Sequence, residues 1–378
     1  MSQVSVPLHA VPVKVVIAGA GVAGLEGLLA LHELAGDRVQ LELIAADLQF
    51  THRPAAVAEP FGLAEHRVYD VAEVALRCGA VLHHSRLDEI DDRAGSGLMA
   101  NGRHVEFDLL LLASGTRTQP ALPGALTFRG PPDVAAYREL LADLRSGAVS
   151  RVAFAVPHGV VWPLPLYELA VLTAAHAAEH GSAAQLTLVT PEERPLDMFG
   201  TAAGGIARRM LDEHGVRLVA GSFPIGFAGR RLSLAPQGAL DADRCVALPV
   251  LTADPVRGLP YTSGFLDVDG HGRVRDCRRV YAAGDVIRFP VKLGGLAAQQ
   301  ADAAARAIAH RAGAPVEAEP FRPDLRAVLS TAAAPRRLSS SVEGAGELPP
   351  LRVTSPVLSA VLDGLSPAEA PRAAGPRA

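Results

Sequence analysis

The sequence predicts an α/β protein made of two successive units, each with buried parallel strands that alternate with helices. In the first unit an apolar run at 14–18 leads through a glycine-rich turn into a helix-like segment at 25–35, and another apolar run follows at 39–45. The second unit repeats this order, with apolar runs at 151–156 and 185–190 on either side of a helix-like segment at 167–179. Short apolar runs of this kind are typical of parallel strands that are buried on both faces of a sheet.

The turn of the first unit has the spacing Gly19-x-Gly21-x-x-Gly24. Gly19 allows the chain to turn sharply off the strand, Gly21 lets a pyrophosphate approach the main chain, and Gly24 lets the helix pack closely on the sheet. The N-terminal amides and the dipole of the helix would then face the phosphates. Because the motif lies between a strand and a helix, it predicts a dinucleotide site that includes Ala23, and a glycine turn without a ligand is the alternative.

The length and the composition indicate a globular protein of two or three domains. The chain of 378 residues is 49% hydrophobic and 20% charged, and its net charge is −4. It has no long basic stripe, so nucleic acid is not an expected partner. No apolar run is long enough to cross a bilayer, and the first residues lack the features of a secretory signal, so we expect a soluble, cytoplasmic protein.

Three cysteines, Cys78, Cys245 and Cys277, are widely spaced along the chain. None of them forms a CxxC or CxxxxC pair, so a local redox disulfide is not expected. An odd number of cysteines at wide spacing indicates reduced and mostly structural thiols.

A further strand is expected over 78–84, and it ends in His83 and His84. Adjacent side chains on a strand face opposite ways, so these histidines do not suggest a metal pair, and no metal site is predicted. The next segment, 87–91, continues this edge of the sheet. Leu87 at its start is assigned to the candidate ligand site.

Two polar residues after the second apolar run bear on nucleotide binding. The strand end often carries an acid for the ribose hydroxyls, but Ala45 stands there and Asp47 follows two residues later. Asp47 either substitutes for that acid or is a solvated loop residue. Arg53 either pairs with a phosphate or lies on the surface, and the sequence leaves both questions open.

The apolar strand expected over 107–116 ends in the small residues Ala113, Ser114 and Gly115. Small side chains at a strand end would let a ligand lie against the main chain. The segment 119–132 is rich in proline and glycine, which predicts a domain linker.

The corresponding turn of the second unit, 157–165, keeps only Gly159 of the glycine motif. Trp162, Pro163 and Pro165 make a poor surface for a pyrophosphate, because bulk blocks the approach to the main chain and proline lacks an N–H donor. The sequence therefore predicts that the fold of the second unit is kept while its dinucleotide site is remodelled.

Four landmarks follow one another in the chain: the glycine turn at 19–24, LLLLASGT at 109–116, the degenerate strand–turn–helix at 152–170, and VYAAGD at 280–285 before an alanine-rich helix. In this order they resemble the FAD-dependent pyridine nucleotide-disulfide oxidoreductase-like flavoproteins, which have two Rossmann-like FAD/NAD(P)-binding domains. The chain is most similar to the branch of sulfide:quinone oxidoreductases, flavocytochrome c sulfide dehydrogenase flavin subunits and type II NADH dehydrogenases. The resemblance covers roughly residues 13–330.

The resemblance implies that the cofactor is FAD. Asp285 would hydrogen-bond its ribityl or pyrophosphate part, unless this carboxylate caps a turn or helix. Lys292 and the helix that begins near Gly295 would lie by the isoalloxazine, where a helix N-terminus favours negative charge on the reduced flavin. The residues assigned to the cofactor are Gly19, Gly21, Ala23, Gly24, Arg53, Leu87, Ala113, Ser114, Gly115, Gly284, Asp285, Lys292 and Gly295.

Two departures from this branch limit the chemistry. Sulfide oxidoreductases use paired cysteines near the flavin, one of them in a C-x-G-P-x-Y-E-like stretch, and here Trp162 replaces that cysteine ahead of Tyr167 and Glu168. Cysteine-persulfide chemistry is therefore not expected. The glycines that bind NAD(P)H in the pyridine-nucleotide enzymes are also missing from the second unit.

Glu168 and Lys292 are the catalytic candidates. Glu168 resembles a helix-start glutamate that lies near the flavin in related reductases, where a carboxylate relays protons, and the alternative is an acid favoured by the helix dipole. Glu192 and Glu193 are either ribose ligands or surface residues. His158, in the remodelled turn, is a candidate for contact with a substrate.

The predicted function is that of an FAD-dependent oxidoreductase that passes electrons between a small-molecule donor and an acceptor such as a quinone. The alternatives are an NAD(P)H-dependent flavin reductase of a protein or small acceptor, and a non-catalytic flavin-binding partner subunit. The sequence does not determine the oligomeric state, and a homodimer is one of the possible states. Membrane association is doubtful, because only 357–365 offers a C-terminal candidate helix.

The domain organisation follows from the order of the landmarks. We expect an FAD-binding domain in two parts, 1–125 and 259–330, which enclose a second Rossmann-like domain at 126–258. Residues 331–378 would form a low-complexity tail that contains one short helix at 356–365.

Overall fold

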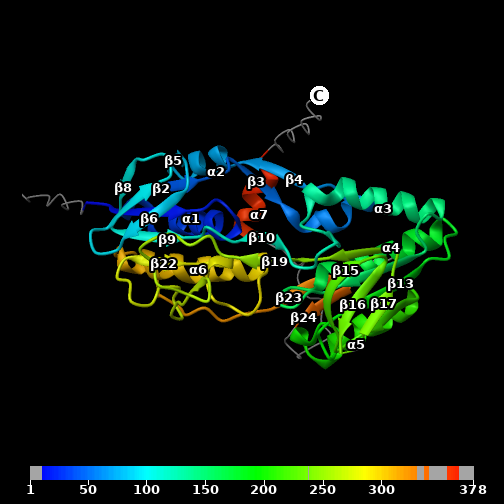
Figure 1. Ribbon diagram of the computed structural model, residues 1–378. Coiled ribbons are helices and arrows are strands. Elements are labelled where there is room, and N and C mark those ends of the chain that lie inside the picture. The colour runs from blue at the N-terminus through cyan, green and yellow to red at the C-terminus, as the bar shows by residue number, and fades with distance from the viewer. Residues whose placement is uncertain (1–10, 237, 330–335, 340–355, 366–378) are drawn as a thin grey trace, which may run out of the picture.

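The computed structural model describes the chain except for residues 1–10, 237, 330–335, 340–355 and 366–378, and it shows two units side by side (Figure 1). Each unit has a parallel five-stranded sheet with helices on one face and a three-stranded antiparallel sheet on the other. The expected α/β fold with two Rossmann-like units is confirmed.

The sheet of the first unit places the strand before the glycine turn at its centre. Its parallel strands are, in order, β22 (Val280–Ala282), β9 (Leu109–Leu112), β1 (Val13–Ala18), β2 (Val39–Ala45) and β5 (Val81–His84). Val15 and Ile17 pack toward the helices, whereas Val16 and Ala18 pack toward the antiparallel sheet. A strand with both faces buried explains why the sequence shows a continuous apolar run there.

The helices of the first unit are α1 (Val22–Ala35), α2 (Val71–Arg77), α6 (Gly294–Arg311) and α7 (Pro356–Asp363). On the opposite face lie β6 (Leu87–Asp91), β7 (Ser96–Met99) and β8 (His104–Glu106), with the turn Asn101–Gly102 between β7 and β8. Leu358, Leu362 and Leu365 are buried in the same apolar cluster as α1. The short helix expected near the C-terminus therefore packs on the first unit.

The second unit repeats this arrangement with different residues. Its parallel strands are, in order, β11 (Leu126–Thr127), β18 (Arg244–Ala247), β12 (Arg151–Ala155), β13 (Gln185–Val189) and β14 (Val216–Val219). Its helices are α3 (Val134–Ser146), α4 (Leu164–Glu179) and α5 (Thr201–Glu213). Its antiparallel sheet consists of β15 (Phe223–Ala228), β16 (Arg231–Ala235) and β17 (Gly238–Asp241).

Two connections run between the units as an antiparallel pair, β10 (Arg117–Pro120) and β19 (Pro249–Thr252), in the middle of Figure 1. Short two-stranded pairs complete the described chain: β3 (Gln49–His52) with β4 (Arg67–Asp70), β20 (Tyr261–Thr262) with β21 (Phe265–Leu266), and β23 (Arg326–Leu329) with β24 (Arg336–Ser339). Within the described ranges, every helix is too short or too polar to span a bilayer.

One local expectation was wrong: Cys78 is the C-cap of α2, so the strand expected over 78–84 begins only at Val81. The segment 119–132, predicted as a domain linker, runs from the end of β10 through β11. Helix α3 was not predicted, although its buried residues recur at helical spacing: Val134, Tyr137, Leu140, Leu141 and Leu144.

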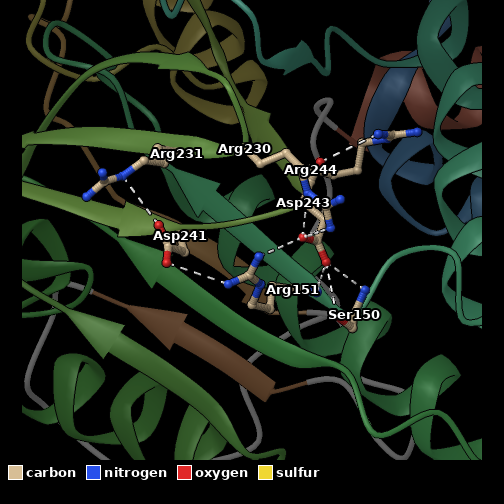
Figure 2. A network of polar contacts seen from close by, with 7 residues as sticks. All are labelled: Ser150, Arg151, Arg230, Arg231, Asp241, Asp243 and Arg244. Carbon is tan, nitrogen blue, oxygen red and sulfur yellow. Dashed lines mark hydrogen bonds and ion pairs between the residues drawn. The ribbon is translucent and has the colours of Figure 1, made fainter.

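A buried carboxylate joins the two sheets of the second unit (Figure 2). The Asp243 side chain is 3% exposed and accepts hydrogen bonds from the main chain and hydroxyl of Ser150, from the main chain and guanidinium of Arg151, and from the Arg230 guanidinium. Burial by itself would raise the pKa of Asp243, but the hydrogen bonds from Arg230 and Ser150 outweigh it and hold the pKa well below its ordinary range.

We expect Asp243→Asn to lower the free energy of unfolding by about 3 kcal/mol at pH 7, because the exposed guanidinium groups of Arg151 and Arg230 and the main-chain donors lose a charged acceptor that is itself buried. A carboxylate with a depressed pKa stabilises the fold above its unfolded pKa of about 3.9 and loses this contribution as the pH falls toward its folded pKa. The difference between wild type and variant in urea titrations should therefore shrink below pH 4. Asp241→Asn is the control, because its side chain is 60% exposed; equal losses in both variants would contradict the assignment.

Candidate functional site

The glycine turn between β1 and α1 leaves room for a ligand at one position only. A Cβ on Gly19 would lie 2.1 Å from the Ala113 carbonyl oxygen, and a Cβ on Gly24 would lie 1.8 Å from the Gly19 carbonyl oxygen. A Cβ on Gly21, by contrast, would meet nothing within 4 Å. The outer glycines are therefore required by packing, whereas Gly21 borders open space, as a group that approaches the main chain requires.

Gly284 brings a distant segment against this turn. It has φ of 79°, and a Cβ there would lie 2.9 Å from the Ala23 Cβ and 3.6 Å from the Ala297 Cβ. Its N–H donates a 3.0 Å hydrogen bond to Oε1 of the buried Gln300. The loop after β22 is thus held between the first turns of α1 and α6.

The N-termini of α1 and α6 have no side-chain cap. Neither Gly21 before α1 nor Leu293 before α6 makes a capping hydrogen bond, and neither helix has an acid in its first turn. The free N–H groups and the positive end of each helix dipole make these positions favourable for anions. Gly295, assigned to the cofactor, lies in the first turn of α6 and is partly exposed.

The end of β9 lies beside the glycine turn. Ala113 is buried, and its main chain is close to Gly19, as the Cβ distance above shows. Ser114 is exposed and Gly115 has φ of 68° with open space around it. The three small residues therefore border the same edge of the sheet as Gly21.

Asp285 is surrounded by polar groups from three segments. Burial raises the pKa of its carboxyl, and the charges of Lys292 and Arg53 together with a hydrogen bond from the Thr116 side chain oppose this shift. Thr116 was not among the predicted site residues, although it directly follows Gly115. The structure thus brings Asp285, Lys292 and Arg53 together.

The Lys292 ammonium is almost completely enclosed. Its Nζ donates a 2.9 Å hydrogen bond to the Asp285 carbonyl and another to the Ile287 carbonyl, and it lies 4.5 Å from the centre of the Phe265 ring. Burial lowers the pKa of Lys292 to about 8, and the charge of Asp285 opposes part of the shift. The lysine therefore both holds the loop between β22 and α6 and supplies a positive charge that titrates near physiological pH.

A cavity of 220 Å³ lies where the two units meet. It is bordered by β10 and β19, by Lys292, and by residues of two loops: Arg53, Ala56 and Val57 in the first unit, and Val160, Val161, Trp162 and Pro165 of the remodelled turn. Most of the lining is apolar, and Arg53, Arg129 and Lys292 contribute positive charge. The carboxylate of Asp133 pairs with Arg129 at 2.5 Å, and Lys292 binds main-chain carbonyls, so the exposed Arg53 is the cation most available to a ligand.

Several predicted residues lie outside this constellation. Glu168 is 7% exposed and does not line the cavity, so its role in proton transfer stays a prediction. Leu87 is buried among the residues between the first sheet and β6–β8, which leaves only its main chain for a ligand. Asp47 is exposed and accepts a hydrogen bond from the Gln49 N–H, and the exposed His158 packs near Phe223 instead of lining the cavity.

Glu192 follows β13, where an acid that binds ribose would be expected, but its carboxylate is hydrogen-bonded within the protein. Its carboxylate accepts a 2.7 Å hydrogen bond from the Tyr167 hydroxyl and a 3.0 Å hydrogen bond from the Thr190 hydroxyl. Burial raises the pKa of Glu192, and these hydrogen bonds oppose the shift. The carboxylate thus connects the loop after β13 to α4, a contact that was not predicted from the sequence.

The three cysteines lie in three different apolar clusters of the molecule. Burial raises the pKa of Cys78 and Cys277 to about 11 and that of Cys245 to about 12. None of them lines the cavity. Protonated thiols are poor nucleophiles, in keeping with the structural role that their spacing indicates.

The fold is an α/β architecture with two Rossmann-like units. Residues 168–309 match the family model described as pyridine nucleotide-disulphide oxidoreductase. Over this region, which is less than half of the chain, the sequence is similar to that family, whose members are FAD-dependent oxidoreductases. The expected resemblance is confirmed at this level, and a comparison with curated protein sequences finds no match.

Solved structures with the same fold come from several reductases. The sulfide:quinone oxidoreductase from Aquifex aeolicus aligns with a TM-score of 0.72 at 17% identity, over 83% of this chain and 79% of that one. A ferredoxin reductase of the CYP199A2 system from Rhodopseudomonas palustris aligns with a TM-score of 0.65 at 19% identity, over 86% and 81%. The Plasmodium falciparum NDH2 in complex with NADH aligns with a TM-score of 0.58 at 14% identity, over 75% and 66%. At such identities these likenesses show the fold alone.

A pair of glycine substitutions separates ligand binding from folding. Gly21→Ala should leave the stability of the apoprotein within about 0.5 kcal/mol of wild type, because the site is open and φ is −80°. It should nevertheless lower the flavin content of the purified protein, because the methyl group occupies the space next to the main chain. Gly24→Ala, with its Cβ 1.8 Å from a carbonyl oxygen, should destabilise the apoprotein by about 1–3 kcal/mol. Full flavin content in Gly21→Ala would contradict the site.

Proposed function

We propose that this chain binds FAD across the N-termini of α1 and α6 and passes electrons from a small-molecule donor to an acceptor such as a quinone. The observation that carries the proposal is the convergence of two uncapped helix N-termini at Gly284, beside the open space at Gly21. An anionic dinucleotide suits these groups, because free N–H donors and positive dipole ends are otherwise left without a partner.

The chain's own residues supply distinct parts of this site. Gly21 and the first turn of α1 would hold the pyrophosphate, and Asp285 would hold hydroxyls of the linking chain. The first turn of α6 and Lys292 would place positive charge beside the redox ring. When bound, FAD supplies the two-electron chemistry, and the protein supplies position and electrostatics.

The cavity between the units supports an acceptor or donor with an apolar ring and partial negative charge. Its walls are largely apolar, with Trp162 and Phe128 among them, and Arg53 and Lys292 lie at its border. Apolar walls with a few polar groups are typical of small-molecule sites, and the cations suit the carbonyl oxygens of a quinone. The raised thiol pKa values support a route that does not use cysteine persulfides.

NAD(P)H as the direct donor has less support. Pro165 removes an N–H donor at the start of α4, and Trp162 fills the turn where a pyrophosphate would approach. Glu192 already accepts hydrogen bonds from Tyr167 and Thr190. A nucleotide would therefore have to displace existing contacts to bind this unit as it binds an intact glycine turn.

The first test is the absorbance spectrum of the purified protein, which should show bound flavin. Without oxygen, stoichiometric NADH or NADPH should not bleach it within seconds, whereas a screen of small-molecule reductants should find a donor. Rapid bleaching by either nucleotide would overturn the assigned donor class. Bound FAD that shows no turnover after dithionite reduction with quinone, dye or oxygen would instead indicate a non-catalytic partner subunit.

The charge of Lys292 should raise the reduction potential of the bound flavin, because a nearby cation favours the more negative, reduced state. Lys292→Met should lower the midpoint potential of the flavin at pH 7. Each tenfold decrease in the equilibrium constant for two-electron reduction corresponds to a drop of about 30 mV. Since the pKa of Lys292 is about 8, the wild-type charge is present below pH 8 and lost above it, so the difference should shrink by pH 9. Lys292→Arg keeps the charge and serves as the control; an equal drop in both variants would indicate that the lysine only holds the loop.

A further inference from the structure

A cluster of possible metal ligands lies at the C-terminal end of α4, far along the chain from the glycine turn. The sequence His176-Ala-Ala-Glu179-His180 places the two histidines four residues apart. Residues at this spacing lie on one face of a helix, one above the other. One ligand atom from each of His176, Glu179 and His180 lies within 4.8 Å of the others.

The tautomer of His180 is set by the main chain. Its Nδ1 lies 2.9 Å from the His176 carbonyl oxygen, and because a carbonyl only accepts, Nδ1 carries the proton. In the neutral ring, Nε2 then has a free lone pair. A ring N–H bonded to a carbonyl is also the arrangement that orients histidines in metal sites.

His176 supplies an independent observation. Its Nε2 is buried and has no hydrogen-bond partner within the described part of the chain. Buried polar atoms without a partner are rare in folded proteins and call for an explanation such as an unseen ion.

We propose that His176, Glu179 and His180 bind one divalent transition-metal ion of the zinc type. Imidazole nitrogen together with a carboxylate oxygen suits Zn²⁺, whereas Mg²⁺ and Ca²⁺ prefer oxygen ligands alone. In a tetrahedral site with bonds of about 2.0–2.1 Å, ligand atoms lie roughly 3.4 Å apart. Glu179 and His180 are both exposed, so their side chains have room to rotate toward this spacing.

The position on the helix adds to the attraction. The last carbonyl groups of a helix and the negative end of its dipole favour a cation. The rings of His176 and His180 already lie with centroids 4.2 Å apart, so little ordering is needed. Three protein ligands leave a fourth position for water or for a group from another molecule.

The test uses the full-length protein without a polyhistidine tag, stripped with a chelator and titrated with Zn²⁺ at pH 7.5 against a chromophoric competitor. Wild type should bind one Zn²⁺, and Mg²⁺ should not compete. His180→Gln should weaken binding at least tenfold, and Glu179→Gln, at an exposed position, should weaken it severalfold. X-ray absorption of the Zn²⁺ form should show two imidazole ligands.

His214→Gln is the matched control. His214 follows the end of α5, and its Nδ1 lies 2.9 Å from the Met210 carbonyl, as in His180, but Met210 stands where the second histidine would be. This variant should bind Zn²⁺ as tightly as wild type. No uptake by wild type, unchanged affinity in both His180→Gln and Glu179→Gln, or an equal loss in His214→Gln would each overturn the site. Circular dichroism of every variant separates loss of binding from loss of fold.

Discussion

The close approach of α1, α6 and the loop after β22 at Gly284 is the constraint on which the candidate site depends. A side chain at residue 284 would collide with Ala23 and be in van der Waals contact with Ala297. Because these three residues are small, segments that lie far apart in the sequence can pack against one another here. The meeting places two uncapped helix N-termini at one edge of the first sheet, which no single segment could do.

Charge in this region is arranged around a buried pair. Asp285 and Lys292 shift each other's pKa values toward the charged forms, while burial acts on both in the opposite direction. Because Lys292 also binds two main-chain carbonyls and faces the Phe265 ring, its charge has a defined position. A fixed charge contributes to electrostatic stabilisation without reorganisation during a reaction.

The second unit keeps the architecture of the first but uses it differently. Its parallel sheet, helices and antiparallel sheet follow the same plan, and Asp243 fixes its two sheets to each other. The turn that would bind a pyrophosphate instead contributes Trp162 and Pro165 to the wall of the central cavity. Packing thus preserved the fold while the surface of the turn changed, because fold and binding depend on different residues.

The sequence by itself determined the architecture and the strand–turn–helix at Gly19–Gly24. Continuous apolar runs predicted β1, β9 and β12, and the glycine spacing predicted the strand–turn–helix, because both signals are local. Helix α3 was also readable from its apolar spacing, and it was missed.

Only the tertiary structure decided which polar groups have partners. Three interactions show this: Thr116 donates a hydrogen bond to Asp285, Tyr167 donates one to Glu192, and Lys292 donates one to the Asp285 carbonyl. The spacing of these residues in the chain does not predict that they are in contact. The sequence also does not distinguish the roles of Gly21 and Gly24. In the structure Gly21 borders open space, whereas Gly24 packs against a carbonyl oxygen. Contacts of this kind depend on how distant elements pack, and packing is a property of the whole fold.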